Sequence, residues 1–454
     1  MMLPTQSLPF DPADPKAALV QLPQAPAVFA LYGEEAHFEP YIGRTPNLRG
    51  RLERLLQPSA KHPRRLQLAG RVRRIEWRLT GSEFESLLLQ FELLEKVYGT
   101  KCLERMHLGA PAFVRFLGSN AYPRIVVTHR PSQREADWAY GPFQSRTAAE
   151  RFADEALKLF LLRRCTEDLD PNPSHPGCVY SEMKMCLAPC YQGCTDERYG
   201  EEAAAVESFL ATRGDSRLVQ LRTERDQASA NLEFESAAAI HAQVQRVEAV
   251  RALAPELVRP LSQLRAVILQ ASAHPDEVAV FLFENGRLRG PAAFSTVGMR
   301  IQNEQSGSSS LFPQPMAIEP TLEETGIRGQ GAGISLDRPE EPIPEETLPA
   351  ALSAGIAASD AMPAKLKRGL LEARMEAALA ELADPSAAAS ATFRQGHLAL
   401  LKRWYYRPEE RRAGEIFFPG AEGHWPIKVM LRGVGRVAGS RFKMAGSSDL
   451  TNPK

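Results

Sequence analysis

The sequence predicts a mixed α/β (α+β) protein with several domains. Its 454 residues are enough for two or three domains of ordinary size. Apolar residues make up 44% of the chain and charged residues 24%, so most of it can bury a core. Short apolar runs typical of strands alternate with amphipathic stretches typical of helices. Together these observations predict a small domain of sheet and helices, a cysteine-rich segment, a helical hairpin and a C-terminal region containing strands.

The first compact unit is predicted over residues 21–105, after a proline-containing tail at residues 1–20. Ser82 is a suitable helix N-cap, and Glu85 three residues later completes a capping box. The elements predicted in this unit are strands at 27–32, 38–43 and 72–79, and helices at 46–56 and 82–98.

The rest of the chain divides by composition. The predicted segments are an α/β connecting region at 106–164, the cysteine segment at 165–200, a helical hairpin at 201–255 and a β-hairpin subdomain at 256–300. Residues 301–349 are rich in Ser, Gly, Pro, Glu and Gln, which predicts a disordered linker. Residues 350–454 are predicted to be partly helical, with short strands at 415–418 and 426–431.

Within these segments the patterns predict strands at 112–117, 123–129, 265–271, 277–283 and 287–294, and helices at 147–162, 201–213, 216–254, 350–382 and 397–406. The net charge is zero, and no stretch has the apolar length of a membrane span. Because the N-terminus lacks the features of a signal peptide, we expect a cytoplasmic protein.

Five of the six cysteines lie between Cys165 and Cys194. In a reducing compartment, clustered cysteines are more often metal ligands than disulfides. Four thiolates can bind zinc or hold an iron–sulfur cluster, and their spacing does not choose between the two. The plainer alternative is a set of buried structural thiols.

The stretch from Tyr41-Ile-Gly43 through Arg44 to Arg51 resembles the second half of the GIY-YIG nuclease signature. With the cysteine segment and a later helical motif, the chain resembles the UvrC family of excinuclease subunits over roughly residues 22–300, and more weakly near 397–418. That resemblance implies Mg²⁺- or Mn²⁺-dependent hydrolysis of DNA, with tyrosines around the nucleophile, an arginine on the phosphate and a glutamate for the metal.

The match to the implied catalytic positions is uneven. Tyr41, Arg44 and Arg51 keep the expected character, although the family usually has lysine at position 44. Phe29 replaces a tyrosine and has no hydroxyl, and Gln90 replaces the metal-binding glutamate. Two further departures are Leu55, where a tyrosine is expected, and Cys102, where an asparagine is expected. These changes predict a degenerate nuclease site, whose remaining residues pack and bind phosphate without chemistry.

A basic surface is predicted around the same motif, because eleven Lys and Arg residues lie between Tyr41 and Arg78 and only Glu53 and Glu76 oppose them. Arginine-rich surfaces bind phosphate through bidentate contacts and counterion release. A solvated charged face is the alternative. The residues predicted to bind DNA are Arg49, Arg54, Arg64, Arg65, Arg73 and Arg74.

The family resemblance also assigns the cysteines and a partner. The closing Cys-x-Ala-Pro-Cys implies a 4Fe-4S cluster, with zinc as the alternative, on Cys165, Cys178, Cys186 and Cys190. The Leu-Glu-Phe-Glu core at Leu232, Glu233, Phe234 and Glu235 resembles the UVR motif, which implies binding to UvrB, the partner excinuclease protein. An ordinary amphipathic helix packed inside the protein is the alternative.

A full-length UvrC continues into an RNase H-like nuclease, and we expect that domain to be absent because residues 350–454 offer only three aspartates. The sequence therefore predicts a UvrC-like repair protein that binds damaged double-stranded DNA and UvrB. One alternative is an active GIY-YIG endonuclease that makes the 3′-side incision. Another is an iron–sulfur protein that binds nucleic acid outside repair.

Overall fold

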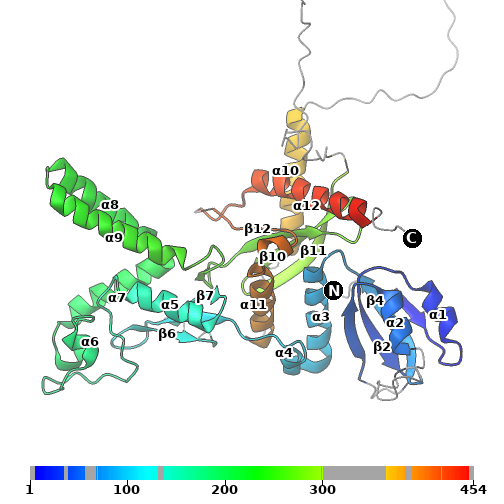
Figure 1. Cartoon of the computed structure of the whole chain (residues 1–454), viewed down its shortest axis with the longest axis horizontal. Helices are drawn as coiled ribbons and strands as arrows, with labels where there is room; N and C mark the ends of the chain where they lie inside the picture. The colour runs from blue at the N-terminus through cyan, green and yellow to red at the C-terminus, as the bar shows by residue number, and fades with distance from the viewer. Residues whose placement is uncertain are drawn as a thin grey trace, which may run out of the picture.

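The computed structural model describes residues 6–34, 39–56, 68, 70–130, 137–297, 299, 364–383, 391–420 and 422–448. Within them lie three antiparallel four-stranded sheets and a projecting pair of helices (Figure 1). The fold class predicted from the sequence is confirmed. The linker predicted at 301–349 lies outside the described residues.

The N-terminal sheet has the strand order β1-β4-β2-β3, all antiparallel. Leucines of α2 and the inward residues of β2 and β4 form its core, including Leu31, Leu48, Leu52 and Ile75. The predicted tail is part of this unit, because Gln6–Pro9 pairs with β4 as an edge strand. The elements are β1 (Gln6–Pro9), α1 (Pro15–Gln21), β2 (Ala27–Gly33), β3 (Tyr41–Thr45), α2 (Leu48–Leu56) and β4 (Val72–Leu79).

Helix α3 (Glu83–Tyr98) links this sheet to the rest of the molecule. Its N-terminus is capped by Ser82, whose side chain accepts from the Glu85 N–H. The Glu85 carboxylate accepts from Gly81 N–H at 2.8 Å, one residue before the position that the predicted capping box requires. Six consecutive residues from Phe84 to Leu89 are buried, so α3 is covered on several sides. A short turn, η1 (Gly99–Lys101), and α4 (Cys102–Arg105) follow it.

The middle sheet has the order β6-β5-β7-β8, and α5 covers it together with the bases of α7 and α9. Helix α5 ends five residues before the predicted end at 162. Strand β7 was not predicted. The elements are β5 (Ala112–Leu117), β6 (Arg124–Thr128), β7 (Asp137–Phe143), α5 (Arg146–Leu157), α6 (Val179–Glu182), η2 (Pro189–Tyr191), α7 (Asp196–Ala211) and β8 (Arg259–Pro260).

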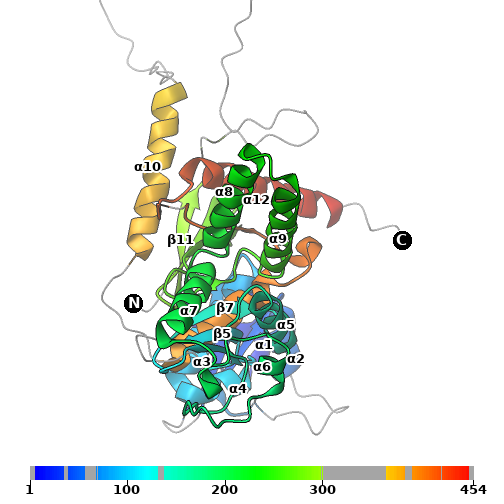
Figure 2. The ribbon, with the colours of Figure 1, turned by 90° about the vertical axis from the view of Figure 1, so that its left-hand side faces the viewer.

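Helices α8 (Asp215–Ala230) and α9 (Phe234–Ala252) lie side by side and project from the middle unit (Figures 1 and 2). The helical pattern at 216–254 is divided into two helices, as the predicted hairpin requires. The chain turns at Leu232, whose φ of 63° is in the left-handed region. Arg222 of α8 and Glu248 of α9 form an ion pair of 2.8 Å across the pair.

The C-terminal sheet has the order β11-β10-β9-β12, so the predicted β-hairpin subdomain and C-terminal region form one unit. The strand predicted at 426–431 is wrong, since these residues begin helix α12. The run Pro426-Ile-Lys-Val-Met-Leu431 is apolar enough for a strand, but Met430 and Leu431 are buried against the sheet from one helix face. The elements are β9 (Ala266–Ala271), β10 (Glu277–Glu284), β11 (Arg287–Ser295), α10 (Ala364–Leu382), α11 (Ala391–Tyr405), η4 (Glu409–Arg411), β12 (Glu415–Phe417) and α12 (Ile427–Ser448).

Helix α11 packs against α3, and both contribute to one core with β9, β10 and β11. Phe84 of α3 lies 5.2 Å from the ring of Phe281 and 5.3 Å from that of Trp404. The C-terminal unit is therefore joined to the N-terminal sheet through α3. Of the helices in the described part of the chain, none has the length and apolar character needed to cross a membrane.

Candidate functional site

Two aromatic residues meet on neighbouring strands of the N-terminal sheet. Phe29 of β2 pairs with Gly43 of β3, and Leu31 pairs with Tyr41, in the antiparallel register. The rings of Phe29 and Tyr41 are 6.1 Å apart, and Phe29 is only 1% exposed. A Cβ at Gly43 would come within 2.8 Å of Phe29 Cζ, so the ring occupies the space that this glycine leaves open. Phe29 is thus a packed core residue, while Tyr41 remains half-buried.

Arg44 is exposed on β3 and is paired with an acidic residue of α3. Its Nη1 lies 3.4 Å from Glu83 Oε1. The same carboxylate accepts two hydrogen bonds from Arg407, at 2.7 and 2.9 Å. These contacts, the Arg407 hydrogen bond first, lower the pKa of Glu83. Glu83 is therefore occupied by two guanidinium groups and is not available as a free carboxylate for a divalent cation.

The remaining predicted catalytic positions carry no acid. Gln90 is half-buried on α3, two turns after Glu83 and on the same side of the helix. Arg51 is half-buried on α2, Leu55 packs against the core of the N-terminal sheet, and Cys102 is fully buried in the core beneath α3. An amide at position 90 is a weak ligand for Mg²⁺ or Mn²⁺. The residues described at this site do not fit a divalent-cation centre.

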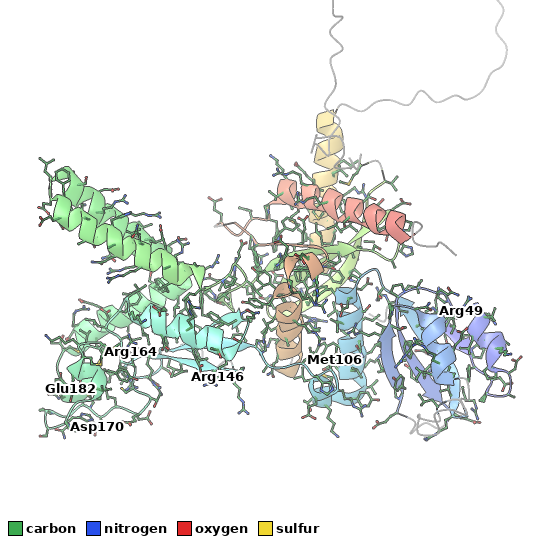
Figure 3. All side chains as sticks on the ribbon, in the orientation of Figure 1. Arg49, Met106, Arg146, Arg164, Asp170 and Glu182 are labelled. Atoms are coloured by element: carbon green, nitrogen blue, oxygen red, sulfur yellow. The ribbon has the colours of Figure 1, made fainter. Side chains whose placement is uncertain are left out.

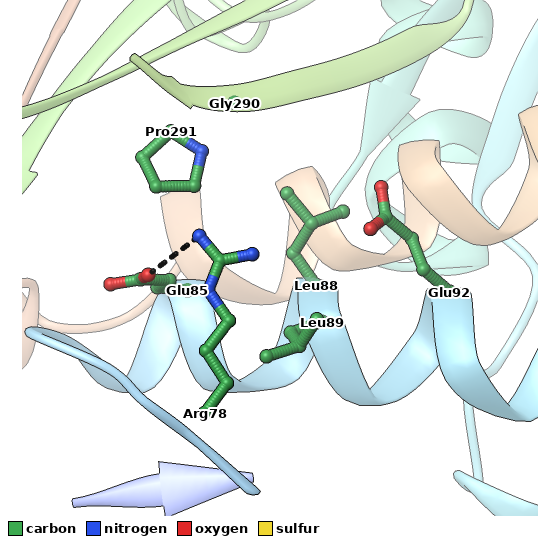
Figure 4. Close-up of a pocket in the computed structure, with 7 residues that line it drawn as sticks. All are labelled: Arg78, Glu85, Leu88, Leu89, Glu92, Gly290 and Pro291. Atoms are coloured by element: carbon green, nitrogen blue, oxygen red, sulfur yellow. Dashed lines mark ion pairs between the residues drawn. The ribbon is translucent and has the colours of Figure 1, made fainter. Parts of the chain in front are cut away.

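Glu85 and Glu92, two acidic residues close to Gln90 in sequence, point away from the predicted nuclease site. Glu85 and Glu92 line a small pocket between α3 and β11, with Gly290 and Pro291 opposite (Figure 4). The volume of this pocket is only about 10 Å³, enough for one water molecule. Burial raises the pKa of Glu92 to about 7, and burial also raises the pKa of Glu85 although Arg78 lies 3.9 Å away. Glu92 therefore does not replace the missing carboxylate at position 90.

Most of the described basic side chains around α2 and β4 contact a neighbouring group through the Nε side of the guanidinium. Arg49 Nε donates to Leu22 O at 2.7 Å, and Arg54 Nε donates to Gly50 O at 2.9 Å. Arg73 and Arg74 form ion pairs with Glu34 and Glu76, at 3.3 and 3.2 Å. Each guanidinium has five N–H donors, so these contacts fix its direction without using all of them. Arg64 and Arg65 lie outside the described residues.

The segment that carries the predicted metal-binding cysteines lies at the opposite end of the molecule from Arg49, in the lobe that holds Arg164, Asp170 and Glu182 (Figure 3). All of these cysteines are free thiols. Burial raises the pKa of Cys186, and the charges of Cys178, Cys190 and Cys165 raise it further.

The fit of these cysteines to a metal group is partial. Backbone N–H groups of Ala188 and Tyr191 hydrogen-bond the Cys186 and Cys190 sulfurs, which suits thiolate ligands. However, the described residues contain no group of three or more His, Cys, Asp or Glu side chains arranged to hold a metal ion. The donor set fits zinc or an iron–sulfur cluster in chemistry, and the sulfurs would have to draw together to bind it.

The tip of the projecting hairpin carries the predicted partner-binding residues. Leu232 is 71% exposed and Phe234 is 64% exposed. Glu233 and Glu235 flank them and are exposed as well. Large apolar side chains at this exposure on a protruding tip indicate a contact surface. The hairpin's own core uses other residues, among them Leu218, Leu221, Val244 and Val247.

Sequence reasoning missed two features of these sites. Glu83 is predicted only as part of a helix start, and its pairing with Arg407, 324 residues away, leaves no local signal. Arg163 lies two residues before Cys165 and is only 2% exposed. The sequence gives no sign that this charged residue, between Leu162 and Arg164, is buried.

Three family descriptions match the chain in sequence order. Residues 25–98 match the UvrC-like GIY-YIG domain, which corresponds to β2 through α3. Residues 113–209 match the UvrC/Cho excinuclease middle domain, and residues 215–250 match the UvrB/UvrC motif, which corresponds to the α8–α9 hairpin. No solved structure matches the chain.

Curated relatives share a common description. UvrABC system protein C from Alcanivorax borkumensis is 29% identical over 238 residues, 52% of this chain and 39% of that protein. The Pseudomonas protegens protein is 27% identical over 340 residues, 74% of this chain and 52% of its own length. The Shigella dysenteriae protein is 30% identical over 243 residues, 53% and 41% of the two lengths. The chain thus spans about half the length of these relatives or less. Over these residues it is UvrC-like, with the GIY-YIG domain, the middle domain and the UVR motif of that family following one another along the chain.

Proposed function

We propose that this chain is a UvrC-like component of nucleotide excision repair in the cytoplasm. In this proposal it binds damaged double-stranded DNA and UvrB but does not cut through its GIY-YIG site. The observation that carries the proposal is the state of that site. The tyrosine position is a buried phenylalanine, the metal-ligand position is an amide, and the nearby carboxylate of Glu83 is held by two arginines.

The proposed role of the N-terminal unit is to hold DNA by its backbone. Arg44 and Arg51 sit on β3 and α2, where they can neutralise phosphate charge without any proton transfer. Hydrolysis would need a group to activate water and an anion to hold Mg²⁺ or Mn²⁺. The second requirement is not met by Gln90, because a neutral amide binds a hard dication weakly.

The proposed contact with UvrB is the tip of the α8–α9 hairpin. Phe234 and Leu232 offer an apolar surface that the hairpin does not use for its own packing. An exposed apolar tip of a two-helix hairpin fits a partner that presents a like pair of helices.

A binding experiment tests this proposal. Wild-type protein is added to UvrB loaded on a lesion-containing duplex, and the larger complex is followed by gel shift. Phe234→Ala should weaken binding by about 10-fold or more, since anchors at interface centres cost over 1 kcal/mol when truncated. Val219→Ala is the matched control, because Val219 is also exposed on this hairpin, at 63%, but lies far from the tip. Equal affinities for wild type and Phe234→Ala would contradict the proposed contact.

A further inference from the structure

Arg163 is a buried cation at the entrance to the cysteine segment. Its exposure is 2%, and its backbone N–H donates to the Tyr199 hydroxyl at 3.2 Å. Nη1 donates to Glu167 O at 3.1 Å and lies 3.8 Å from Cys165 Sγ, while Nε is buried without a hydrogen-bond partner. Among the described residues, no carboxylate forms an ion pair with it. A buried guanidinium without an anion is costly, because charges inside proteins are normally paired.

Other arginines add positive charge at the same place. Arg124 of β6 has a lowered pKa, first because of burial and then because of the charge of Arg163. Arg164 follows directly, and its Nε is also buried without a hydrogen bond. Cys165 and the exposed Asp168 act in the opposite direction on the pKa of Arg124, while Arg115 lowers it further. The site therefore holds one buried positive charge, Arg163, beside two half-buried ones, Arg124 and Arg164.

The cysteines can supply the missing anion only as thiolates. As neutral thiols they leave Arg163 uncompensated. Four thiolates around Zn²⁺ carry a net negative charge, as do four thiolates around a 4Fe-4S core. Cys165, whose sulfur is the one next to Nη1, is the first of the four in the chain. The excess positive charge of the arginines and the expected negative charge of such a group complement each other.

We propose that Arg163 is the fixed counter-charge of an anionic metal–thiolate group held by Cys165, Cys178, Cys186 and Cys190. This inference rests on the proposed cysteine-bound cofactor and adds a positioning residue to it. Its guanidinium holds the Cys165 end of the segment through the Glu167 carbonyl and offsets charge that the bound group brings into a buried place. Outer-shell partners of this kind typically alter metal affinity by about 10- to 100-fold.

The test compares the 454-residue wild-type chain with Arg163→Met and Arg163→Lys, all purified without oxygen. Iron, zinc and sulfide per chain are measured, together with the rate of metal loss to a chelator. Arg163→Met should lose its metal about 10-fold faster than wild type or more, and Arg163→Lys should recover part of the difference because it keeps the charge. The matched control is Arg146→Met on α5, an exposed arginine that pairs with Glu150 and should behave as wild type.

A second measurement separates a charge role from a packing role. Thermal unfolding is recorded for each variant with metal bound and after metal removal. The counter-charge role predicts that Arg163→Met is less stable than wild type only when metal is bound, since removing an unpaired buried charge relieves the metal-free protein. Equal destabilisation in both states, or unchanged metal loss in Arg163→Met, would overturn the inference. Metal-free wild type after anaerobic purification would instead contradict the cysteine-bound group itself.

Discussion

At the scale of single residues, the departures from the nuclease pattern have different structural meanings. Phe29 could be read from the sequence as a lost hydroxyl, but its burial against Gly43 could not. Gln90 keeps the position and loses the charge. Glu83 supplies a carboxylate on the same side of α3, and Arg44 and Arg407 occupy it. Sequence motifs identified which residues differ from the nuclease pattern. The ion pairs that occupy Glu83 come from residues distant in sequence and could be seen only in the structure.

Glu92 gives a pH prediction at the same scale. Burial raises its pKa from 4.5 to about 7, so the folded protein keeps a proton that the unfolded chain releases. Because the folded state binds more protons, stability falls as pH rises through the window from 4.5 to 7. Glu92→Gln should remove this loss and make the protein more stable at pH 8, on the order of 2 kcal/mol.

Chemical denaturation at pH 5 and pH 8 measures the effect. The control is Glu95→Gln, one turn further along α3, which should follow the wild-type pH dependence. If wild type and Glu92→Gln lose stability in parallel between the two pH values, Glu92 is not the group responsible.

At the scale of elements, local patterns located most strands and helices to within a few residues. Strand β5 occupies the predicted 112–117, and β12 forms where 415–418 was predicted. Strand β7 was missed because its Gly141-Pro142 pair breaks the alternation that marks a strand. The corner of the hairpin at Leu232 was predicted from its motif, although the positive φ of this leucine has no signature in composition. For β7, tertiary contacts outweighed local preference.

The packing of α11 on α3 depends on a glycine. A Cβ at Gly396 would lie 2.1 Å from Phe91 Cζ, and Phe91 is fully buried in edge contact with His397. Gly396→Ala should therefore destabilise the protein by about 1–3 kcal/mol through overpacking, despite the higher helix propensity of alanine. Thermal unfolding gives the change.

Gly369 of α10 provides the opposite case. No atom lies within 4 Å of a Cβ added there. Gly369→Ala should leave stability unchanged or raise it by up to about 1 kcal/mol, because it only improves helix propensity. Equal effects of the two substitutions would mean that the contact between α11 and α3 is not tight.

At the scale of the whole molecule, the three segments that match UvrC-family descriptions occupy separate parts of the structure. The nuclease-like sheet and the cysteine lobe lie far apart, and the hairpin projects from the middle unit (Figures 1 and 3). The C-terminal unit reaches back to the nuclease-like domain, where Arg407 binds the Glu83 carboxylate at the start of α3. Sequence analysis could name these parts in order. It could not show that the C-terminal unit contacts the nuclease-like domain, because the hydrogen bonds between Arg407 and Glu83 join residues 324 positions apart.

The most direct measurement is incision of a lesion-containing duplex in the presence of UvrA, UvrB, ATP and Mg²⁺ or Mn²⁺. Wild type runs beside Gln90→Glu and the double change Phe29→Tyr, Gln90→Glu. The single change restores the metal ligand without disturbing the packing of Phe29 against Gly43. We predict no 3′-side cut by wild type bound to the UvrB–DNA complex, and measurable cutting when the carboxylate and hydroxyl are restored. A 3′-side cut by wild type would contradict the account and show that other residues supply the metal site.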